Sequence, residues 1–184
     1  MQESTGRCNI NCLIDMSSAS PVQFACDAML GGLARWLRAA GYDASWQAGI
    51  ADWDLIRQAR EQGRVLLTCD TGIFRIGIIR DGDLPALLLP HSLATKQEQL
   101  AYVLERLHLE PRSPRCMACG GALAALAKET VRDRVPPRSF AQVDQFYECT
   151  RCGKLFWEGT HWQQIAAVLE AIRSRPGADP EAGR

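Results

Sequence analysis

The stretch "GRVLLTCD", residues 63–70, decides the fold. Residues 65–69 form an apolar run with the length and composition of a buried strand, and the run ends at the carboxylate of Asp70. A strand that is buried on both faces is typical of a parallel sheet covered by helices on two sides. Ligands of such sheets bind beyond the carboxyl ends of the strands, which is the position of Asp70.

Apolar runs and helical patterns alternate on both sides of this stretch. The runs predict strands at 22–26, 42–48 and 85–90, and the apolar spacing predicts helices at 28–41, 52–63, 95–109 and 162–172. Asp52 is placed to cap the second helix, and Thr95 with Glu98 has the spacing of a capping box. Residues 72–83 have no regular pattern. The alternation predicts an α/β fold, a parallel sheet flanked by helices.

Composition and charge set the class of protein and its domains. The chain has 47% apolar residues and no net charge, and it contains neither a membrane-spanning run nor the apolar core of a signal peptide. We therefore expect a cytoplasmic protein without membrane contact. The expected domains are a disordered leader (1–20), a mildly acidic domain with the strand and helix alternation (21–111), a more basic cysteine module with a helix (112–172) and a disordered tail (173–184). The charge difference suits a metal centre beside a polyanion-binding surface, or is ordinary scatter of solubilising charges.

Acidic residues gather at the predicted carboxyl edge of the sheet. Asp27 and Asp70 end two strands, and Asp52 and Asp54 open the helix after another. Each one alone could be a helix N-cap. Together, carboxylates at one edge repel each other unless a cation screens them, which favours Mg²⁺ or Mn²⁺. Such ions activate water and stabilise the displacement reaction at a phosphodiester. The sequence contains neither a glycine-rich phosphate loop nor a nucleophile elbow, so any catalysis depends on the carboxylates and a metal.

Four cysteines form two matched knuckles, "CMACG" (116–120) and "CTRCG" (149–153). Two C-x-x-C pairs supply the four thiolates of a closed tetrahedral zinc site, which is structural because it leaves no open coordination position. Disulfide bonds are the alternative. The predicted zinc ligands are Cys116, Cys119, Cys149 and Cys152. Cys26 and Cys69 are expected to be small core residues.

Three segments together resemble the Mut-seven C-terminal RNase domain family, whose members join a PIN-like nuclease domain to a zinc ribbon. They are "DAMLGGLARWLRAAGYD" (27–43), "DWDLIRQAREQGRVLLTCD" (52–70) and the cysteine module, and the likeness runs from about residue 23 to residue 163. The resemblance implies metal-dependent hydrolysis of RNA, leaving a 5′-phosphate and a 3′-hydroxyl. It also implies that Asp27, Asp52, Asp54 and Asp70 are catalytic, and that Asp27, Asp52 and Asp70 hold Mg²⁺ or Mn²⁺.

The sequence departs from the family pattern beside the last of these acids. The family usually has "LLTRD" followed by a basic residue, whereas this chain has Cys69 and Thr71 at the two positions. The alternative function is therefore a zinc-ribbon RNA-binding protein with little or no catalysis. A receiver-like signalling domain also places aspartates at strand ends, but it needs a lysine after a fifth strand, where the cysteine module begins.

Basic and aromatic side chains are the candidates for contact with RNA. Basic residues could follow a phosphate backbone, and aromatic rings could stack on unpaired bases. The alternatives are a solvated basic hairpin between the knuckles, and packing of the aromatic residues between the two domains. The predicted nucleic-acid-binding residues are Arg35, Arg38, Arg132, Arg134, Arg138, Trp157 and His161, and Trp162 is a further candidate for stacking.

Overall fold

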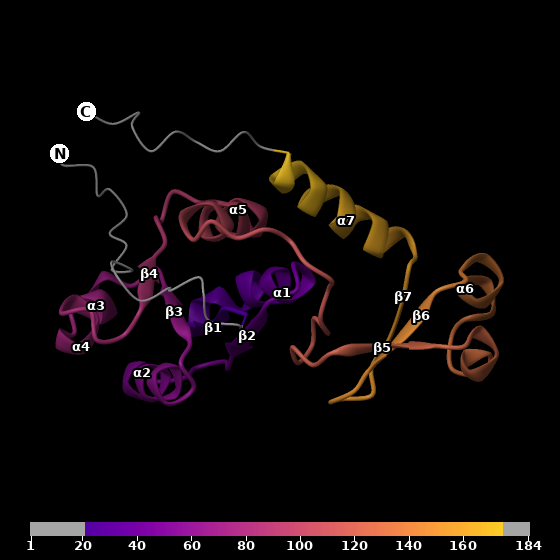
Figure 1. The fold of residues 1–184 in the computed structure, drawn as a ribbon, viewed down its shortest axis with the longest axis horizontal. Helices are drawn as coiled ribbons and strands as arrows, with labels where there is room; N and C mark the ends of the chain where they lie inside the picture. The colour runs from indigo at the N-terminus through magenta and orange to yellow at the C-terminus, as the bar shows by residue number, and fades with distance from the viewer. Residues whose placement is uncertain (1–20, 175–184) are drawn as a thin grey trace.

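The computed structural model describes residues 21–174, so the predicted leader and the tail from residue 175 lie outside the described residues. Its first part is a four-stranded parallel sheet with the strand order β2-β1-β3-β4 (Figure 1). The strands are β1 (Gln23–Cys26), β2 (Asp43–Trp46), β3 (Val65–Thr68) and β4 (Ala86–Leu88). All four were predicted from the sequence.

Helices cover both faces of this sheet. In β3, Leu67 packs in the cluster that contains α1 (Gly31–Ala39) and α5 (Lys96–Arg106), whereas Leu66 packs in the opposite cluster. That second cluster contains α2 (Asp52–Glu61), α3 (Thr71–Phe74) and α4 (Gly77–Arg80). The prediction of a parallel sheet flanked by helices is confirmed. The pattern-free segment at 72–83 holds α3 and α4, which are too short to show helical periodicity.

Two predicted helix starts have different outcomes. The capping box of α5 is present, because the Glu98 N–H donates to Thr95 Oγ1 at 3.1 Å and the Thr95 N–H donates to Glu98 Oε2 at 2.9 Å. The predicted cap at Asp52 is wrong, since Ala51 occupies the cap position without a side-chain bond and Asp52 is the first helical residue. The Asp52 carboxylate is therefore not used as a cap.

The second part is a three-stranded antiparallel sheet of β5 (Leu123–Leu126), β6 (Phe146–Cys149) and β7 (Leu155–Trp157). The basic segment between β5 and β6 is not a hairpin, which was one of the two alternatives for it. It forms the short helices η2 (Lys128–Val131) and α6 (Pro137–Gln142), which lie at the end of this part far from the parallel sheet (Figure 1). A small apolar cluster of Val131, Val135 and Phe146 holds them to the strands.

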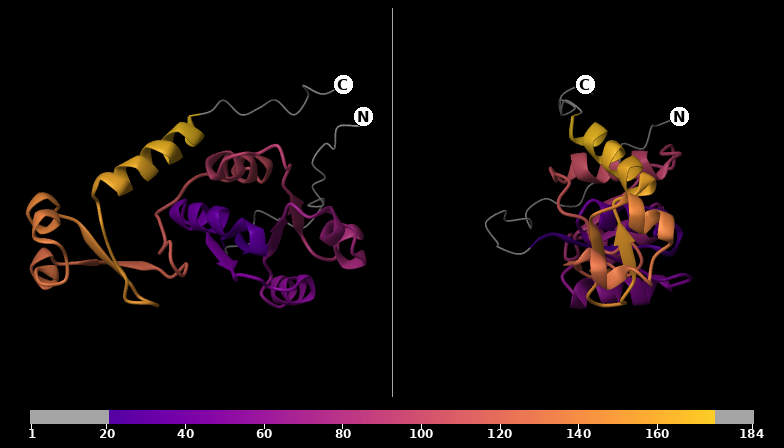
Figure 2. Two further views of the ribbon diagram at one scale, coloured as in Figure 1. Left: turned by 180° about the vertical axis from the view of Figure 1, so that it is seen from behind. Right: turned by 90° about the vertical axis from the view of Figure 1, so that its right-hand side faces the viewer.

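The last helix, α7 (Thr160–Arg173), runs back from β7 toward the parallel-sheet part, as the left view in Figure 2 shows. Its side chains Leu169 and Ile172 pack against the cluster of α1 and α5, and Arg173 Nη2 donates to the Pro111 carbonyl at 3.2 Å. No helix within residues 21–174 combines the length and apolar character needed to span a bilayer.

Arg38 is a second connection between the two parts. Its side chain is only 6% exposed, and its Nε donates to the Ala44 carbonyl of β2 at 2.8 Å. Its Nη1 donates to the carbonyls of Met117 and Ala118, inside the first cysteine knuckle, at 3.1 and 2.9 Å. Nε and Nη1 of Arg38 are therefore used within the protein, and its predicted contact with nucleic acid stays a prediction.

We predict that Arg38→Met destabilises the protein and that Arg35→Met does not. The Arg38 substitution keeps much of the buried side-chain volume but leaves buried carbonyl groups without donors, at a cost of about 1–3 kcal/mol in unfolding free energy. Arg35 lies on the same helix and is exposed, so its substitution is expected to change stability by less than about 0.5 kcal/mol. Urea denaturation of the zinc-loaded protein measures both, and equal losses would contradict the role of Arg38 as a connection.

Candidate active site and metal centre

Asp27 is held at the carboxyl end of β1 by three hydrogen bonds. Its backbone N–H donates to the Leu67 carbonyl of β3 at 3.0 Å, which continues the pairing of the two strands. Its carboxylate accepts from Thr68 Oγ1 at 2.6 Å and from the Ala28 N–H at 2.5 Å. The Asp27 carboxylate is thus fixed in position, with 6% of the residue exposed at the edge of the sheet.

Thr68 connects Asp27 to Asp70. The Thr68 hydroxyl donates to the Asp27 carboxylate and accepts from the backbone N–H of Asp70 at 2.9 Å. The exposed Asp70 carboxylate accepts from the Gly72 N–H at 2.6 Å, which caps α3. Each aspartate therefore caps the helical turn that follows it, and the two are connected through Thr68. Because an ionised carboxylate offers about four acceptor positions, capping leaves oxygen lone pairs for a cation.

Asp52 and Asp54 make no hydrogen bond with Asp27, Thr68 or Asp70 among the described residues. Both are exposed in the first turn of α2, and the Asp54 carboxylate pairs with Arg57 at 2.6 Å. Within residues 21–174, the cysteines are the only group in which three or more candidate ligand atoms gather closely enough for a metal. The structure therefore joins two of the four predicted acids directly. Asp52 lies on the same side of the sheet as Asp27 and Asp70, because α2 begins after the carboxyl end of β2.

Asp27 and Asp70 fit a Mg²⁺ or Mn²⁺ ion by their chemistry. Magnesium keeps several waters and is usually bound by one or two carboxylates together with substrate phosphates. Two carboxylates that have separate backbone donors suit such a site, and one hydroxyl bonds to the Asp27 carboxylate and to the Asp70 backbone N–H. The exposed position of Asp70 leaves this edge accessible to a phosphodiester.

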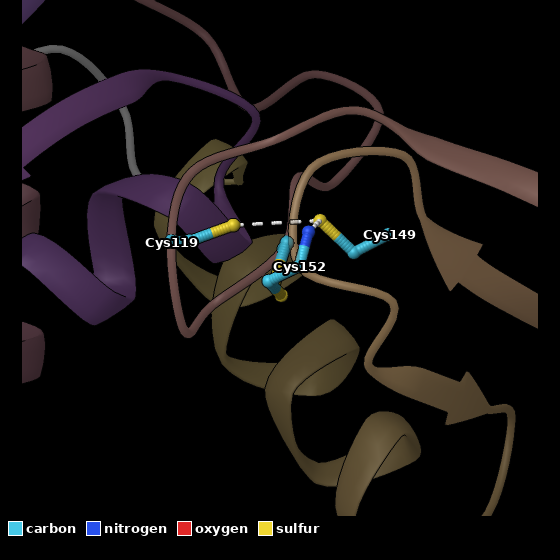
Figure 3. A group of neighbouring side chains, drawn as sticks. Cys119, Cys149 and Cys152 are labelled. Atoms are coloured by element: carbon cyan, nitrogen blue, oxygen red, sulfur yellow. Dashed lines mark hydrogen bonds between the residues drawn. The ribbon is translucent and has the colours of Figure 1, made fainter.

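The four predicted zinc ligands come together. The sulfur atoms of Cys116 and Cys152 are 3.7 Å apart, those of Cys119 and Cys149 are 3.4 Å apart, and all four lie within 4.8 Å of one another. Figure 3 shows three of these side chains, Cys119, Cys149 and Cys152. Tetrahedral zinc with Zn–S bonds of about 2.3 Å requires sulfurs about 3.8 Å apart. The cluster could therefore bind zinc. In residues 21–174 all the cysteines are free, so the disulfide alternative is not supported.

The backbone around Cys149 favours its thiolate. Desolvation raises the pKa of this thiol, but the N–H groups of Cys152 and Arg151 donate to its sulfur and lower the pKa to about 6. A Cβ on Gly121 would lie 2.7 Å from the same sulfur, so only glycine fits there. The chain thus prepares one charged ligand before a metal binds.

Three of the predicted RNA contacts share one cleft. Arg35 and Arg38 of α1 and His161 of α7 line a cavity of about 500 Å³ between the two parts, together with Lys154. Arg132, Arg134 and Arg138 lie instead at the distant end with η2 and α6 (Figure 1). There Arg132 lies over the Phe140 ring at 5.0 Å, and Arg134 pairs with Glu148.

The closing aromatic residues are used in packing. Trp157 packs against the apolar cluster of the second sheet. Trp162 stacks on Tyr147, with ring centroids 5.5 Å apart and planes at 4°. Both tryptophans therefore pack on residues of the second sheet, which differs from the expected packing between the two domains, and the role of Trp157 in RNA binding stays a prediction.

The sequence patterns did not single out two side chains near Asp27, Trp46 and Lys96. Trp46 ends the edge strand β2, and Lys96 begins α5. Both lie against the glycine pair Gly31–Gly32, which follows the turn at Asp27. The two adjacent glycines at the start of the helix were the available signal. Glycine destabilises a helix, so a glycine pair there indicates that other side chains pack closely against the backbone.

The comparison with known proteins gives one family. The model of the Mut7-C RNAse domain matches residues 22–169, which include the acidic edge, both cysteine knuckles and most of α7. No curated protein and no solved structure gives a significant match. The resemblance seen in the sequence motifs is thereby confirmed.

We predict that the protein purifies with one zinc ion per chain and that Cys149→Ser reduces the bound zinc strongly. The substitution removes the thiolate that the backbone prepares, whereas Cys69→Ala leaves the cluster unchanged, because Cys69 is buried in the parallel-sheet core. Elemental analysis of both variants measures the zinc content. A Cys149→Ser protein that keeps a full zinc equivalent, or a zinc-free parent chain, would contradict the assignment.

Proposed function

Because the chain belongs to the Mut7-C RNAse domain family, we propose that it is a metal-dependent ribonuclease that hydrolyses phosphodiester bonds at the edge occupied by Asp27 and Asp70. The observation that carries the proposal is the Thr68 hydroxyl, which bonds to the Asp27 carboxylate and to the Asp70 backbone. One buried side chain thereby fixes two acidic residues that lie 43 positions apart in the chain. The rigidity of the acids is what a metal site requires.

The residues have distinct roles in this proposal. Asp27 and Asp70 hold Mg²⁺ or Mn²⁺, and Asp52, at the start of α2, provides a further acidic group at the same edge. The bound ion lowers the pKa of water and stabilises the charge that develops on the phosphate. Thr68 orients Asp27 from behind, and the N–H of Gly72 orients Asp70.

The cysteine cluster has a structural role in the same proposal. Four thiolates close the coordination sphere of zinc, so the ion offers no position to a substrate. Its knuckle carbonyls accept from Arg38, which connects the zinc module to β2 and α1. Zinc therefore acts by holding the second part in place beside the acidic edge.

One observation favours a second candidate, an RNA-binding protein with little catalysis. Cys69, which stands where the family has arginine, is buried, and Thr71 is uncharged, so neither supplies a cation beside Asp70. RNA binding without Mn²⁺-dependent cleavage of any RNA would favour this candidate over the ribonuclease.

We predict that Asp70→Asn abolishes Mn²⁺-dependent cleavage and leaves the fold and the zinc content intact. The amide keeps an oxygen to cap α3 but loses the charge that binds the cation. The expected loss exceeds the roughly 10–100-fold that removal of an outer-shell partner costs. Asp144→Asn is the matched control, since Asp144 is an exposed acid that pairs with Lys128 in the zinc module. Full activity of Asp70→Asn in contaminant-free protein would refute the proposal.

We also predict that Thr68→Val lowers activity by about 10–100-fold and raises the Mn²⁺ concentration that gives half-maximal rate. Valine has nearly the shape of threonine but cannot donate to Asp27 or accept from Asp70. Thr68→Ser restores the hydroxyl and is expected to recover most of the activity. Metal titrations of the cleavage rate separate this positioning role from simple destabilisation, which would leave the metal dependence unchanged.

A further inference from the structure

The glycine pair after Asp27 makes room for two particular side chains. A Cβ on Gly31 would lie 2.6 Å from two ring carbons of the Trp46 indole, and a Cβ on Gly32 would lie 2.9 Å from the side-chain carbons of Lys96. Real Cβ atoms do not approach other atoms so closely. Each glycine therefore allows one side chain from a different element to lie against the start of α1.

Trp46 is held rigidly although it remains accessible. Its indole N–H donates to the Ala28 carbonyl at 2.9 Å, and Ala28 follows Asp27 directly. The side chain nevertheless stays 38% exposed, one of a few large apolar residues with such exposure. An aromatic ring that is fixed next to an acidic edge and open to solvent is suited to stacking on a base.

Lys96 lies beside the segment that follows Asp27, because its side-chain carbons lie against Gly32. Burial raises the pKa of the Cys69 thiol, the Asp27 carboxylate raises it further, and Lys96 lowers it. No ion pair of Lys96 with an acidic side chain occurs within residues 21–174.

Trp46 forms one wall of the cleft between the two parts. The cleft volume of about 500 Å³ lies within the range of roughly 300–1,000 Å³ that is usual for small-ligand sites. Its other walls carry cationic groups, and no acidic side chain of residues 21–174 forms an ion pair with them. The lining residues that matter here are Gly31, Trp46, Arg35, Lys154, Phe156 and His161.

We propose that this cleft binds the nucleotide next to the scissile phosphodiester, with its base stacked on Trp46 and its phosphate near the cationic walls, while Lys96 contacts the scissile phosphate. The identification of that phosphate rests on the proposed ribonuclease function. The cleft needs an unpaired base, because the bases of a duplex are already stacked and paired. The substrate class is therefore single-stranded RNA.

The test measures binding separately from cleavage. Fluorescence anisotropy of labelled single-stranded oligouridine and of an RNA duplex of equal length is recorded with full-length, zinc-loaded protein. The Asp70→Asn background prevents cleavage if the ribonuclease proposal holds. We expect the single strand to bind more tightly than the duplex, and Trp46→Ala to weaken single-strand binding about tenfold. Trp46→Phe, which keeps an aromatic ring, is expected to retain most of the affinity.

Two matched controls locate the effect in the cleft. Gly31→Ala is expected to weaken binding as Trp46→Ala does, because the new methyl group displaces the indole, whereas Gly77→Ala meets no atom closer than 3.7 Å and is expected to bind normally. Trp53→Ala removes another exposed tryptophan, which lies outside the cleft on α2, and is also expected to bind normally.

The outcomes distinguish this inference from the ribonuclease proposal. Unchanged single-strand binding by Trp46→Ala, an equal loss in Trp53→Ala, or equal binding of the duplex would overturn the inference, even if the parent protein cleaves RNA. Trp46-dependent binding by a parent protein that cleaves no RNA would instead contradict the ribonuclease and leave a single-strand binding cleft.

Discussion

The parallel pairing of β1 with β3 is the constraint on which the proposed chemistry depends. The pairing ends with the Asp27 N–H on the Leu67 carbonyl, and this contact places the Thr68 hydroxyl against the Asp27 carboxylate. The same hydroxyl accepts from the Asp70 N–H, so the two strand ends form one hydrogen-bonded unit. A shift of one residue in this register would turn Thr68 to the other face of the sheet and separate the two acids.

The second part of the protein is connected to the parallel sheet through Arg38. Its buried guanidinium connects β2 to the carbonyls of the first cysteine knuckle, and α7 returns from the second sheet to pack beside α1 and α5. These two connections bring Lys154 and His161 opposite Arg35 across the cleft. A cluster that could bind zinc thus influences the surface next to the acidic edge without touching it. The connection is a direct one, because the Met117 and Ala118 carbonyls of the first knuckle accept the hydrogen bonds of Arg38.

Much of the architecture could be predicted because it follows from local chemistry. Apolar runs of strand length identified β1, β3 and β4, the more polar stretch at 42–48 was a candidate for β2, and the spacing of Thr95 and Glu98 identified the start of α5. Two C-x-x-C-G knuckles identified the four cysteines that gather within 4.8 Å. Asp27 and Asp70 were identifiable as strand-end acids. The helical turns at 72–83 and between β5 and β6 were not predictable, because such short elements are stabilised by tertiary packing and have little periodicity of their own.

The roles of individual polar residues were harder to predict, as Arg35 and Arg38 illustrate. Both are arginines on one helix, three residues apart, yet Arg35 is exposed in the cleft and Arg38 is buried against the knuckle. The sequence by itself determined the alternation of strands and helices in the parallel-sheet part, the strand-end acids and the paired cysteines, since these follow from periodicity and from ligand spacing. Only the tertiary structure decided that Thr68 joins two of the acids and that Trp46 lies against Gly31, because both contacts form between elements distant in the chain and no local pattern encodes them.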